Sequence, residues 1–207
     1  MTEIILASQS PRRQDLLQRM GVVFRTQPSD YDERLDESRD AEAVAMELAC
    51  GKAEAVAALH PDAYVIGSDT VVAIDGRQME KPVDIDDARE MLTALSGGAS
   101  TVSTGVAIVC QSLGIRDVRV ATTTVCFKPD SDDVRKLREA YLATNDWRDK
   151  AAGYGIQSGA APLIERIIGD YTTVVGLPTH LLTEMLAQHG IDATPVDEQA
   201  PVRQETA

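Results

Sequence analysis

A short apolar run, a polar turn and a second apolar pair constrain most strongly how this chain can fold. Residues 4–7 are Ile-Ile-Leu-Ala, residues 8–13 are Ser-Gln-Ser-Pro-Arg-Arg, and Leu16-Leu17 follow shortly afterwards. The run is long enough for one buried strand, Ser10 is a preferred N-cap, and Pro11 is a preferred first helical residue. The beginning of the sequence therefore predicts a strand, a tight turn and a helix.

The same turn has the chemistry of an anion-binding site. Unpaired N–H groups and the positive end of the helix dipole favour a negative charge at a helix start. Arg12 and Arg13 add planar guanidinium groups that match phosphate oxygens, so a polyphosphate fits this turn. From the spacing alone, an ordinary capped helix with two solvated arginines remains the alternative.

Composition narrows the classes of protein. The 207 residues suffice for one large domain or for two lobes that share a cleft. The net charge of −13 argues against a nucleic-acid partner, which would require a basic surface. The three cysteines are widely spaced and form no CxxC pair, so neither a disulfide framework nor a zinc site is expected. Without a signal peptide or a membrane-spanning run, we expect a cytoplasmic protein with no membrane partner.

Alternating helical and strand periods predict an α/β domain with a mixed sheet. Helices are expected at 41–59, 84–95 and 131–141 and before Gly190, and strands at 22–24, 63–74, 101–110, 118–127, 163–167 and 173–175. The segment 192–207 is rich in Pro, acidic residues and Gln and has no apolar period. We therefore expect one folded domain over 1–191 and a disordered tail over 192–207.

Two charged residues stand within apolar patterns. Lys52 lies in the apolar row of the helix expected at 41–59, where it either extends its ammonium to water or meets a ligand in a cleft. Asp69 interrupts the strand expected at 63–74, and a carboxylate there is costly unless it is paired, hydrogen-bonded or metal-bound. Asp69 is thus a candidate site residue, with a purely structural role as the alternative.

Together with further segments, these motifs resemble the Maf family of nucleoside triphosphate pyrophosphatases. The matching positions follow the family order over nearly the whole chain: 6–13, Glu33, Lys52, 68–71, 81–82, 96–97, 149–150, 154–157 and 171–178. The resemblance implies an elongated α/β fold related to inosine triphosphate pyrophosphatases, with a cleft between two lobes, and commonly a homodimer. It also implies hydrolysis of a nucleotide to its monophosphate and pyrophosphate with a divalent metal.

The resemblance assigns roles that suit the chemistry of the side chains. Glu33 and Asp69 are hard oxygen ligands for Mg²⁺ or Mn²⁺, and Asp69 also orients a water or accepts its proton. The residues expected to hold the phosphates are Arg13, Lys52, Lys81, Ser8 and Ser10.

Within the family, the chain is similar to the branch that acts on dTTP and UTP. The branch acting on 7-methyl-GTP usually has Trp before the arginines, Gln after the Asp and Glu in the late loop. The expected base-reading residues are Arg12, Thr70 and Gln157. A glutamine amide can accept from N3–H and donate to O4 of uracil or thymine.

Two residues depart from the family pattern, one before Gln157 and one directly after it. Ala152 and Ser158 each stand where the family usually has glycine, and a serine at 158 is strained if that position needs a positive φ. The substrate range is therefore less well defined than the reaction. A pyrophosphatase for other nucleotides, such as 7-methyl-GTP, and a non-enzymatic regulator of cell division remain as alternatives.

Overall fold

The first strand and helix follow the predicted turn. The computed structural model describes residues 3–32 and 39–206. Strand β1 (Ile4–Leu6) is fully buried, and helix α1 (Pro11–Arg19) begins directly after Ser10. The Ser10 hydroxyl accepts from the backbone N–H of Arg13 at 3.5 Å, and Pro11 is the first helical residue. The predicted cap is confirmed.

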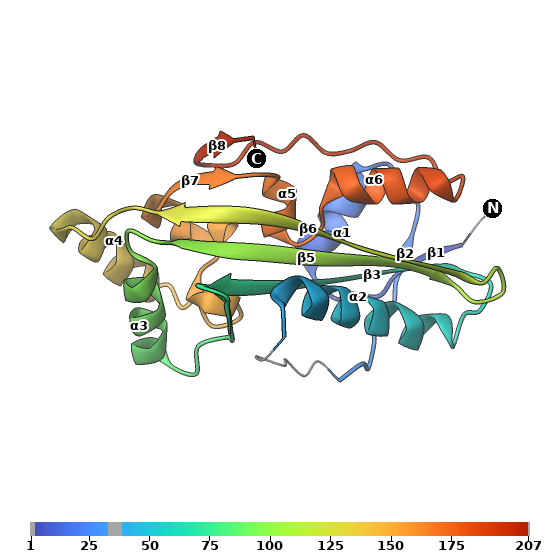
Figure 1. The fold of residues 1–207 in the computed structure, drawn as a ribbon, viewed down its shortest axis with the longest axis horizontal. Helices are drawn as coiled ribbons and strands as arrows, with labels where there is room; N and C mark the ends of the chain where they lie inside the picture. Colours follow the sequence, from blue (N-terminus) through green and yellow to red (C-terminus); the bar gives the residue numbers. More distant parts are fainter. Residues whose placement is uncertain (1–2, 33–38, 207) are drawn as a thin grey trace. The chain divides into compact units, whose positions relative to one another are not determined.

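The strands form one mixed sheet, as predicted (Figure 1). Its order is β2-β1-β3-β5-β6-β7-β8, and β4 pairs with β3 outside this path. Strand β1 is parallel to β2 and β3, whereas the pairs β3–β4 and β6–β7 are antiparallel. The bounds after β1 are β2 (Arg25–Thr26), β3 (Tyr64–Ile74), β4 (Arg77–Met79), β5 (Ala99–Cys110), β6 (Ile115–Phe127), β7 (Ile164–Ile168) and β8 (Arg203–Glu205).

The longer helices also agree with the sequence pattern. They are α2 (Ala41–Ala57), α3 (Ile85–Leu95), α4 (Asp132–Leu142) and α6 (Thr179–Gln188). Short 3-10 and π-helical turns occupy 151–163. No helix within the described residues is long and apolar enough to cross a membrane.

Two strand predictions are wrong. Residues 22–24 are not a strand, and β2 begins at Arg25. The side chain of Val23 is 87% exposed, so it packs against no face of the sheet. The stretch 173–175 lies in helix α5 (Tyr171–Val175). Its β-branched residues favour a strand, but the N–H groups of Gly176 and Leu177 bond back to the carbonyl of Thr172 and close a helical turn.

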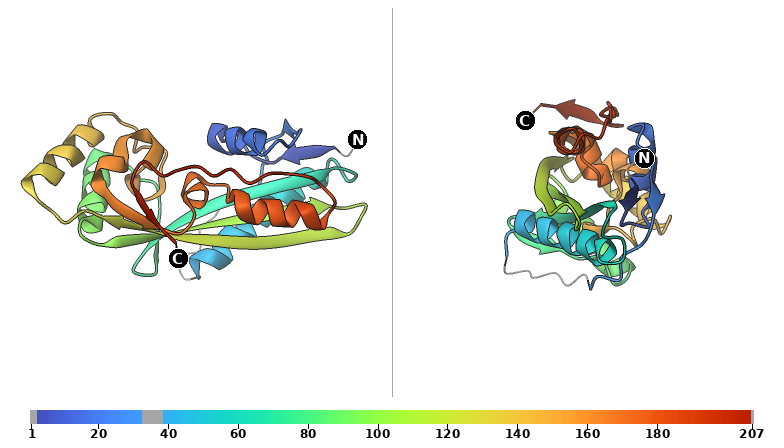
Figure 2. Two further views of the ribbon diagram at one scale, coloured as in Figure 1. Left: turned by 90° about the horizontal axis from the view of Figure 1, so that it is seen from above. Right: turned by 90° about the vertical axis from the view of Figure 1, so that its right-hand side faces the viewer.

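The chain forms two compact units, and β3, β5 and β6 contribute residues to both. The first unit contains residues 1–70, 103–121 and 172–198, and the second contains 71–102, 122–171 and 199–207. In the first unit, α2 and α6 lie on opposite faces of the strands (Figures 1 and 2). A Cβ on Gly67 of β3 would meet the carbonyl oxygen of Ala49 at 2.1 Å, and one on Gly105 of β5 would meet that of Ala45 at 2.2 Å. Glycine at these two positions therefore lets α2 pack directly on the sheet.

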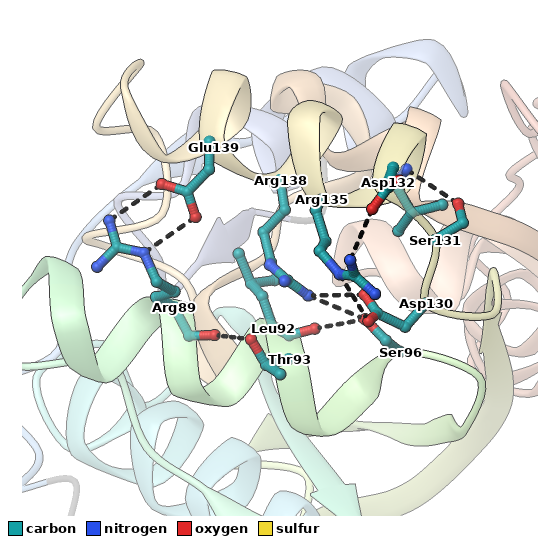
Figure 3. A network of polar contacts seen from close by, with 11 residues as sticks. Arg89, Leu92, Thr93, Ser96, Asp130, Ser131, Asp132, Arg135, Arg138 and Glu139 are labelled. Carbon is teal, nitrogen blue, oxygen red and sulfur yellow. Dashed lines mark hydrogen bonds and ion pairs between the residues drawn. The ribbon is translucent and has the colours of Figure 1, made fainter.

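In the second unit, polar contacts join α3 and α4 (Figure 3). Arg89 of α3 donates to both carboxylate oxygens of Glu139 of α4, at 3.0 and 3.1 Å. Arg138, which is only 7% exposed, donates to the Ser96 hydroxyl at 3.2 Å and lies 3.6 Å from the Asp130 carboxylate. Charged and polar side chains of the two helices and of the turns beside them thus hold α3 and α4 side by side.

The segment predicted to be a disordered tail makes specific contacts where the structure describes it, up to residue 206. The Thr194 N–H donates to the Met20 carbonyl at 3.0 Å, and the Val196 N–H donates to the Thr179 hydroxyl at 3.1 Å. Val196 is buried. Farther on, β8 pairs in parallel with β7. The boundary at 191 between a domain and a tail stays a prediction.

Candidate functional site

Lys52 and Asp69 form a buried ion pair in the first unit. Lys52 Nζ lies 2.5 Å from Asp69 Oδ1, and both side chains are about nine-tenths buried, at 9% and 11% exposed. Helix α2 supplies the lysine, and β3 supplies the aspartate in the middle of an apolar strand. Each charge satisfies the other, which explains how both interrupt apolar patterns.

A second group of contacts surrounds Arg13 of α1. Two of its members, Ser68 and Thr70, flank Asp69 in β3. Arg13 donates from Nε to the Gly176 carbonyl at 2.8 Å, from Nη2 to the Thr70 hydroxyl at 3.1 Å, and from Nη1 to the Ser8 hydroxyl at 3.4 Å. The Ser68 hydroxyl donates to the same Gly176 carbonyl at 3.0 Å. Thr70 and Thr104 share a hydroxyl–hydroxyl bond at 3.0 Å, and Thr104 donates to the Thr173 carbonyl at 2.8 Å. We call Ser8, Arg13, Ser68, Thr70, Thr104 and Gly176 the Arg13 network.

The two serines and two arginines of the predicted anion site lie on or directly after the turn before α1. Ser8 is buried and accepts from the Ser10 N–H at 3.2 Å, so the two hydroxyls lie on one tight turn. Arg12 is exposed, whereas Arg13 is half-buried. The two arginines therefore differ: Arg13 is fixed by the fold, and Arg12 projects into solvent.

The structure describes one of the two predicted metal ligands. Glu33 lies outside the described residues, while Asp69 is held by Lys52 as above. Within the part of the chain that the structure describes, no three His, Cys, Asp or Glu side chains gather into a metal-holding group.

The two remaining predicted site residues, Lys81 and Gln157, belong to the second unit, and both are exposed. The Ala152 N–H donates to the Glu80 carbonyl at 3.0 Å, and a Cβ on Gly153 would lie 3.5 Å from Pro82 Cγ. The segment of Lys81 is thus joined to the loop that leads to Gln157. That Lys81 and Gln157 share a site with Asp69 stays a prediction.

The loop of Gln157 is held by a tyrosine. The Gly155 N–H donates to the Tyr141 hydroxyl at 3.1 Å, and both the Ser158 and Ala160 N–H groups bond to the Gly155 carbonyl. Burial raises the pKa of Tyr141 to about 12, so its hydroxyl is neutral at physiological pH. Gln157 therefore lies on a turn whose backbone is fixed from one side by α4.

The two departures from the family pattern have different outcomes. Ser158 has φ −111° and is unstrained, and its hydroxyl lies 3.4 Å from the Gly155 carbonyl. Ala152 has φ +56°, the left-handed region that favours glycine. Position 158 does not need a positive φ, so Ser158 is not strained. Of the two residues, Ala152 has the strained backbone.

Sequence reasoning missed three residues of these sets. The sequence pattern assigns no site role to Gly176, Thr104 or Tyr141. A glycine directly after a short β-branched run was the one available signal, because it often marks a positive φ, which Gly176 has at +110°. The partners of Thr104 and Tyr141 are distant in sequence and gave no local signal.

These features fit the class of α/β proteins that bind phosphorylated ligands: a strand, a serine-rich turn with two arginines, and a buried Lys–Asp pair next to it. The chain belongs to the Maf family, since the family model described as Maf-like protein matches residues 3–189.

Several relatives align with this chain over nearly its whole length. A dTTP/UTP pyrophosphatase of Moorella thermoacetica is 45% identical over 93% of this chain and 97% of its own length. A dTTP/UTP pyrophosphatase of Symbiobacterium thermophilum is 42% identical over 92% and 95%. One of Pyrococcus furiosus is 40% identical over 90% and 95%.

Proposed function

We propose that this protein hydrolyses nucleoside triphosphates, with dTTP and UTP preferred, to the monophosphate and pyrophosphate. The observation that carries the proposal is the buried Lys52–Asp69 pair, because Asp69 is flanked by Ser68 and Thr70, both members of the Arg13 network. The relatives named dTTP/UTP pyrophosphatase support the reaction and the choice of base.

The residues fit a divalent cation. Mg²⁺ is usually held by one or two carboxylates together with waters and substrate phosphates, not by a cage of protein ligands alone. The Asp69 carboxylate on β3 supplies hard oxygen donors. We propose Glu33 as the second carboxylate ligand. When bound, Mg²⁺ or Mn²⁺ would neutralise phosphate charge and lower the pKa of a water.

The chain's own residues have separate roles in this proposal. Asp69 accepts a proton from the water that attacks the α-phosphorus, and Lys52, ion-paired with Asp69, orients that carboxylate. Ser8 and Ser10 at the start of α1 bind phosphate oxygens, and Arg13 balances the charge that develops on the leaving pyrophosphate. Lys81 adds a further cation to the phosphates.

The base is read by Gln157 together with Arg12 and Thr70. The Gln157 amide offers an acceptor for N3–H and a donor for O4, and Arg12 can donate to O2. Cytosine presents the opposite pattern at N3 and N4. A mispaired buried polar group costs about 1–3 kcal/mol, which corresponds to about 5- to 150-fold discrimination.

The setting of the protein is also part of the proposal. We infer a cytoplasmic enzyme that acts as a homodimer and binds neither nucleic acid nor membrane. The net charge of −13 supports the absence of a polyanionic partner. Cys50, Cys110 and Cys126 are free and buried, which suits a reducing compartment.

The experiment is turnover of a nucleotide panel by wild type and by Asp69→Asn. Wild type with Mg²⁺ should convert UTP and dTTP to monophosphate and pyrophosphate faster than CTP, ATP or GTP. Asp69→Asn should still fold, because the amide has the same shape and its oxygen can accept from Lys52, but with lower stability because the buried ammonium loses its counter-charge. Its kcat should fall by about 10²–10⁴-fold. The products, not only phosphate release, must be identified by chromatography.

Three results would contradict the proposal. A wild type inactive on every nucleotide, including 7-methyl-GTP, would favour the regulator of cell division. Equal rates on CTP and UTP would remove the base-reading role of Gln157. A well-folded Asp69→Asn with full turnover would remove Asp69 from the reaction.

A further inference from the structure

Gly176 occupies the turn at which helix α5 ends. Its N–H donates to the carbonyls of Thr172 and Thr173, at 3.0 and 3.1 Å, and the Leu177 N–H donates to Thr172 at 3.0 Å. The φ of Gly176 is +110°, which L side chains rarely adopt. The N–H groups of Gly176 and Leu177 therefore close the last turn of the helix. The Gly176 carbonyl instead accepts hydrogen bonds from other segments of the chain.

That carbonyl accepts two hydrogen bonds from two different motifs. Arg13 Nε donates to it at 2.8 Å and the Ser68 hydroxyl at 3.0 Å. A carbonyl oxygen has two lone pairs, so both of its acceptor positions are in use. Gly176 therefore connects the arginine of the α1 turn with the residue directly before Asp69.

Space also restricts this position to glycine. A Cβ on Gly176 would lie 3.2 Å from the Thr70 hydroxyl oxygen and 3.4 Å from Arg13 Nε. The first distance is tighter than ordinary van der Waals contact and the second is at its lower limit, and both neighbours belong to the Arg13 network. A side chain at position 176 would therefore press on Thr70 and contact Arg13, which the Gly176 carbonyl holds.

We propose that Gly176 is a positioning residue, whose carbonyl fixes the Arg13 guanidinium for its contact with the triphosphate. The inference rests on the proposed function, because it assigns to Arg13 a contact with the substrate. The guanidinium keeps its charge while Gly176, Thr70 and Ser8 determine its orientation. A preoriented charge stabilises a transition state better than one that must reorganise during the reaction.

The first test compares Gly176→Ala with Gly190→Ala and Gly21→Ala. All three glycines have positive φ, at +110°, +71° and +80°, but a Cβ on Gly190 or Gly21 meets nothing within 4 Å. All three changes place a Cβ at a positive φ, and only Gly176→Ala brings that Cβ against the Arg13 network. We expect Gly176→Ala to lose about 10- to 100-fold in kcat/KM for UTP, mainly in kcat, and the two controls to stay within about 2-fold. A Gly176→Ala enzyme as active as the controls would overturn the proposal.

A double-mutant cycle separates positioning from general damage. Arg13→Lys keeps the positive charge but has no Nε–H to bond with the Gly176 carbonyl. In that background, Gly176→Ala should cost less than about 3-fold further, because the contact is already lost. A loss as large as in wild type would show that Gly176 acts independently of Arg13 and would overturn the proposal.

A spectroscopic measurement is independent of turnover. The Arg13 Nε–H resonance, assigned through its loss in Arg13→Lys, should exchange with solvent far more slowly than that of the exposed neighbour Arg12. It should be lost or exchange-broadened in Gly176→Ala and retained in Gly190→Ala. Exchange as fast as for Arg12 overturns the proposal even if Gly176→Ala does not fold. If wild type hydrolyses no nucleotide, the proposed function fails, and this resonance still decides whether Gly176 holds Arg13.

Discussion

Lys52 and Asp69 neutralise each other inside the first unit, so a change in one residue leaves the other as an isolated buried charge. The pair is 2.5 Å apart, and both side chains are about nine-tenths buried. Removing one partner of a buried pair commonly costs more than the pair itself contributes to stability. We therefore expect Lys52→Met to lower the free energy of unfolding by about 3 kcal/mol at pH 7, measured by urea denaturation.

Lys136→Met is the matched control. Lys136 pairs with Asp133 at 3.4 Å, but the two side chains are 79% and 91% exposed, so the change should stay within about 0.5 kcal/mol. The double variant Lys52→Met/Asp69→Asn should recover most of the loss, because no buried charge remains. Equal stability of Lys52→Met and Lys136→Met would contradict this account of the pair.

Ala152 gives a second prediction for a single residue, this time about backbone conformation. It has φ +56° and is completely buried. Ala152→Gly removes a buried methyl group but also relieves the left-handed conformation, which costs a residue with a Cβ about 1–2 kcal/mol. The two effects oppose each other, so we expect a change in the free energy of unfolding of less than about 1 kcal/mol.

Ala49→Gly, in the middle of α2, is the comparison for this variant. Ala49 is equally buried but helical, so its replacement loses the methyl group and helix propensity together and should cost about 2 kcal/mol. Thermal denaturation of both variants measures the difference. If Ala152→Gly is as destabilising as Ala49→Gly, position 152 is not strained in solution.

Helix α4 and the loop of Gln157 are connected through one hydroxyl. Tyr141 on α4 accepts from the Gly155 N–H at 3.1 Å, two residues before Gln157. Tyr141→Phe would leave this N–H without its partner and let the loop shift. Because a base is distinguished only when the Gln157 amide is fixed, we expect the ratio of kcat/KM for UTP over CTP to fall several-fold, with turnover of UTP largely retained.

Tyr154→Phe serves as the control for this element. Tyr154 is also buried and directly precedes Gly155, but its hydroxyl bonds to the Ser100 hydroxyl of β5 at 2.8 Å, whereas the Gly155 N–H donates to Tyr141. It should lose stability without a change in the nucleotide ratio. A Tyr141→Phe enzyme with the wild-type ratio would mean that Tyr141 does not position the loop.

At the scale of the whole molecule, the segment after residue 191 can be tested by truncation. Val196 is 8% exposed and bonded to Thr179, and β8 pairs with β7. Deletion of 192–207 should lower the free energy of unfolding by about 2 kcal/mol, because it exposes the surface that Val196 covers and the edge of β7. Val196→Ala should show part of this loss. An unchanged melting temperature after truncation would support the disordered tail expected from composition.

The fold was largely predictable because its signals are local. The cap at Ser10, the helical period of α2 and the strand β3 all depend on neighbours in sequence, and the structure confirms them. The failures have a common cause. Residues 22–24 and 173–175 have strand-like side chains, but the pairing partner or the closing hydrogen bond decides their conformation.

The residues of the candidate site likewise fall into those that a local sequence pattern indicated and those that only the tertiary structure showed. The sequence alone determined which residue types stand out: serines and arginines at a helix start, a lysine in an apolar helix row and an aspartate in an apolar strand, since each violates or completes a local pattern. Only the tertiary structure decided that Lys52 faces Asp69, that Arg13 is held by Gly176, and that Ala152, not Ser158, has the strained backbone. These outcomes depend on contacts between residues 17 and 163 positions apart and on a single φ angle. Periodicity and propensity carry no information about such contacts, because they describe how a residue suits its own element and not what lies across from it.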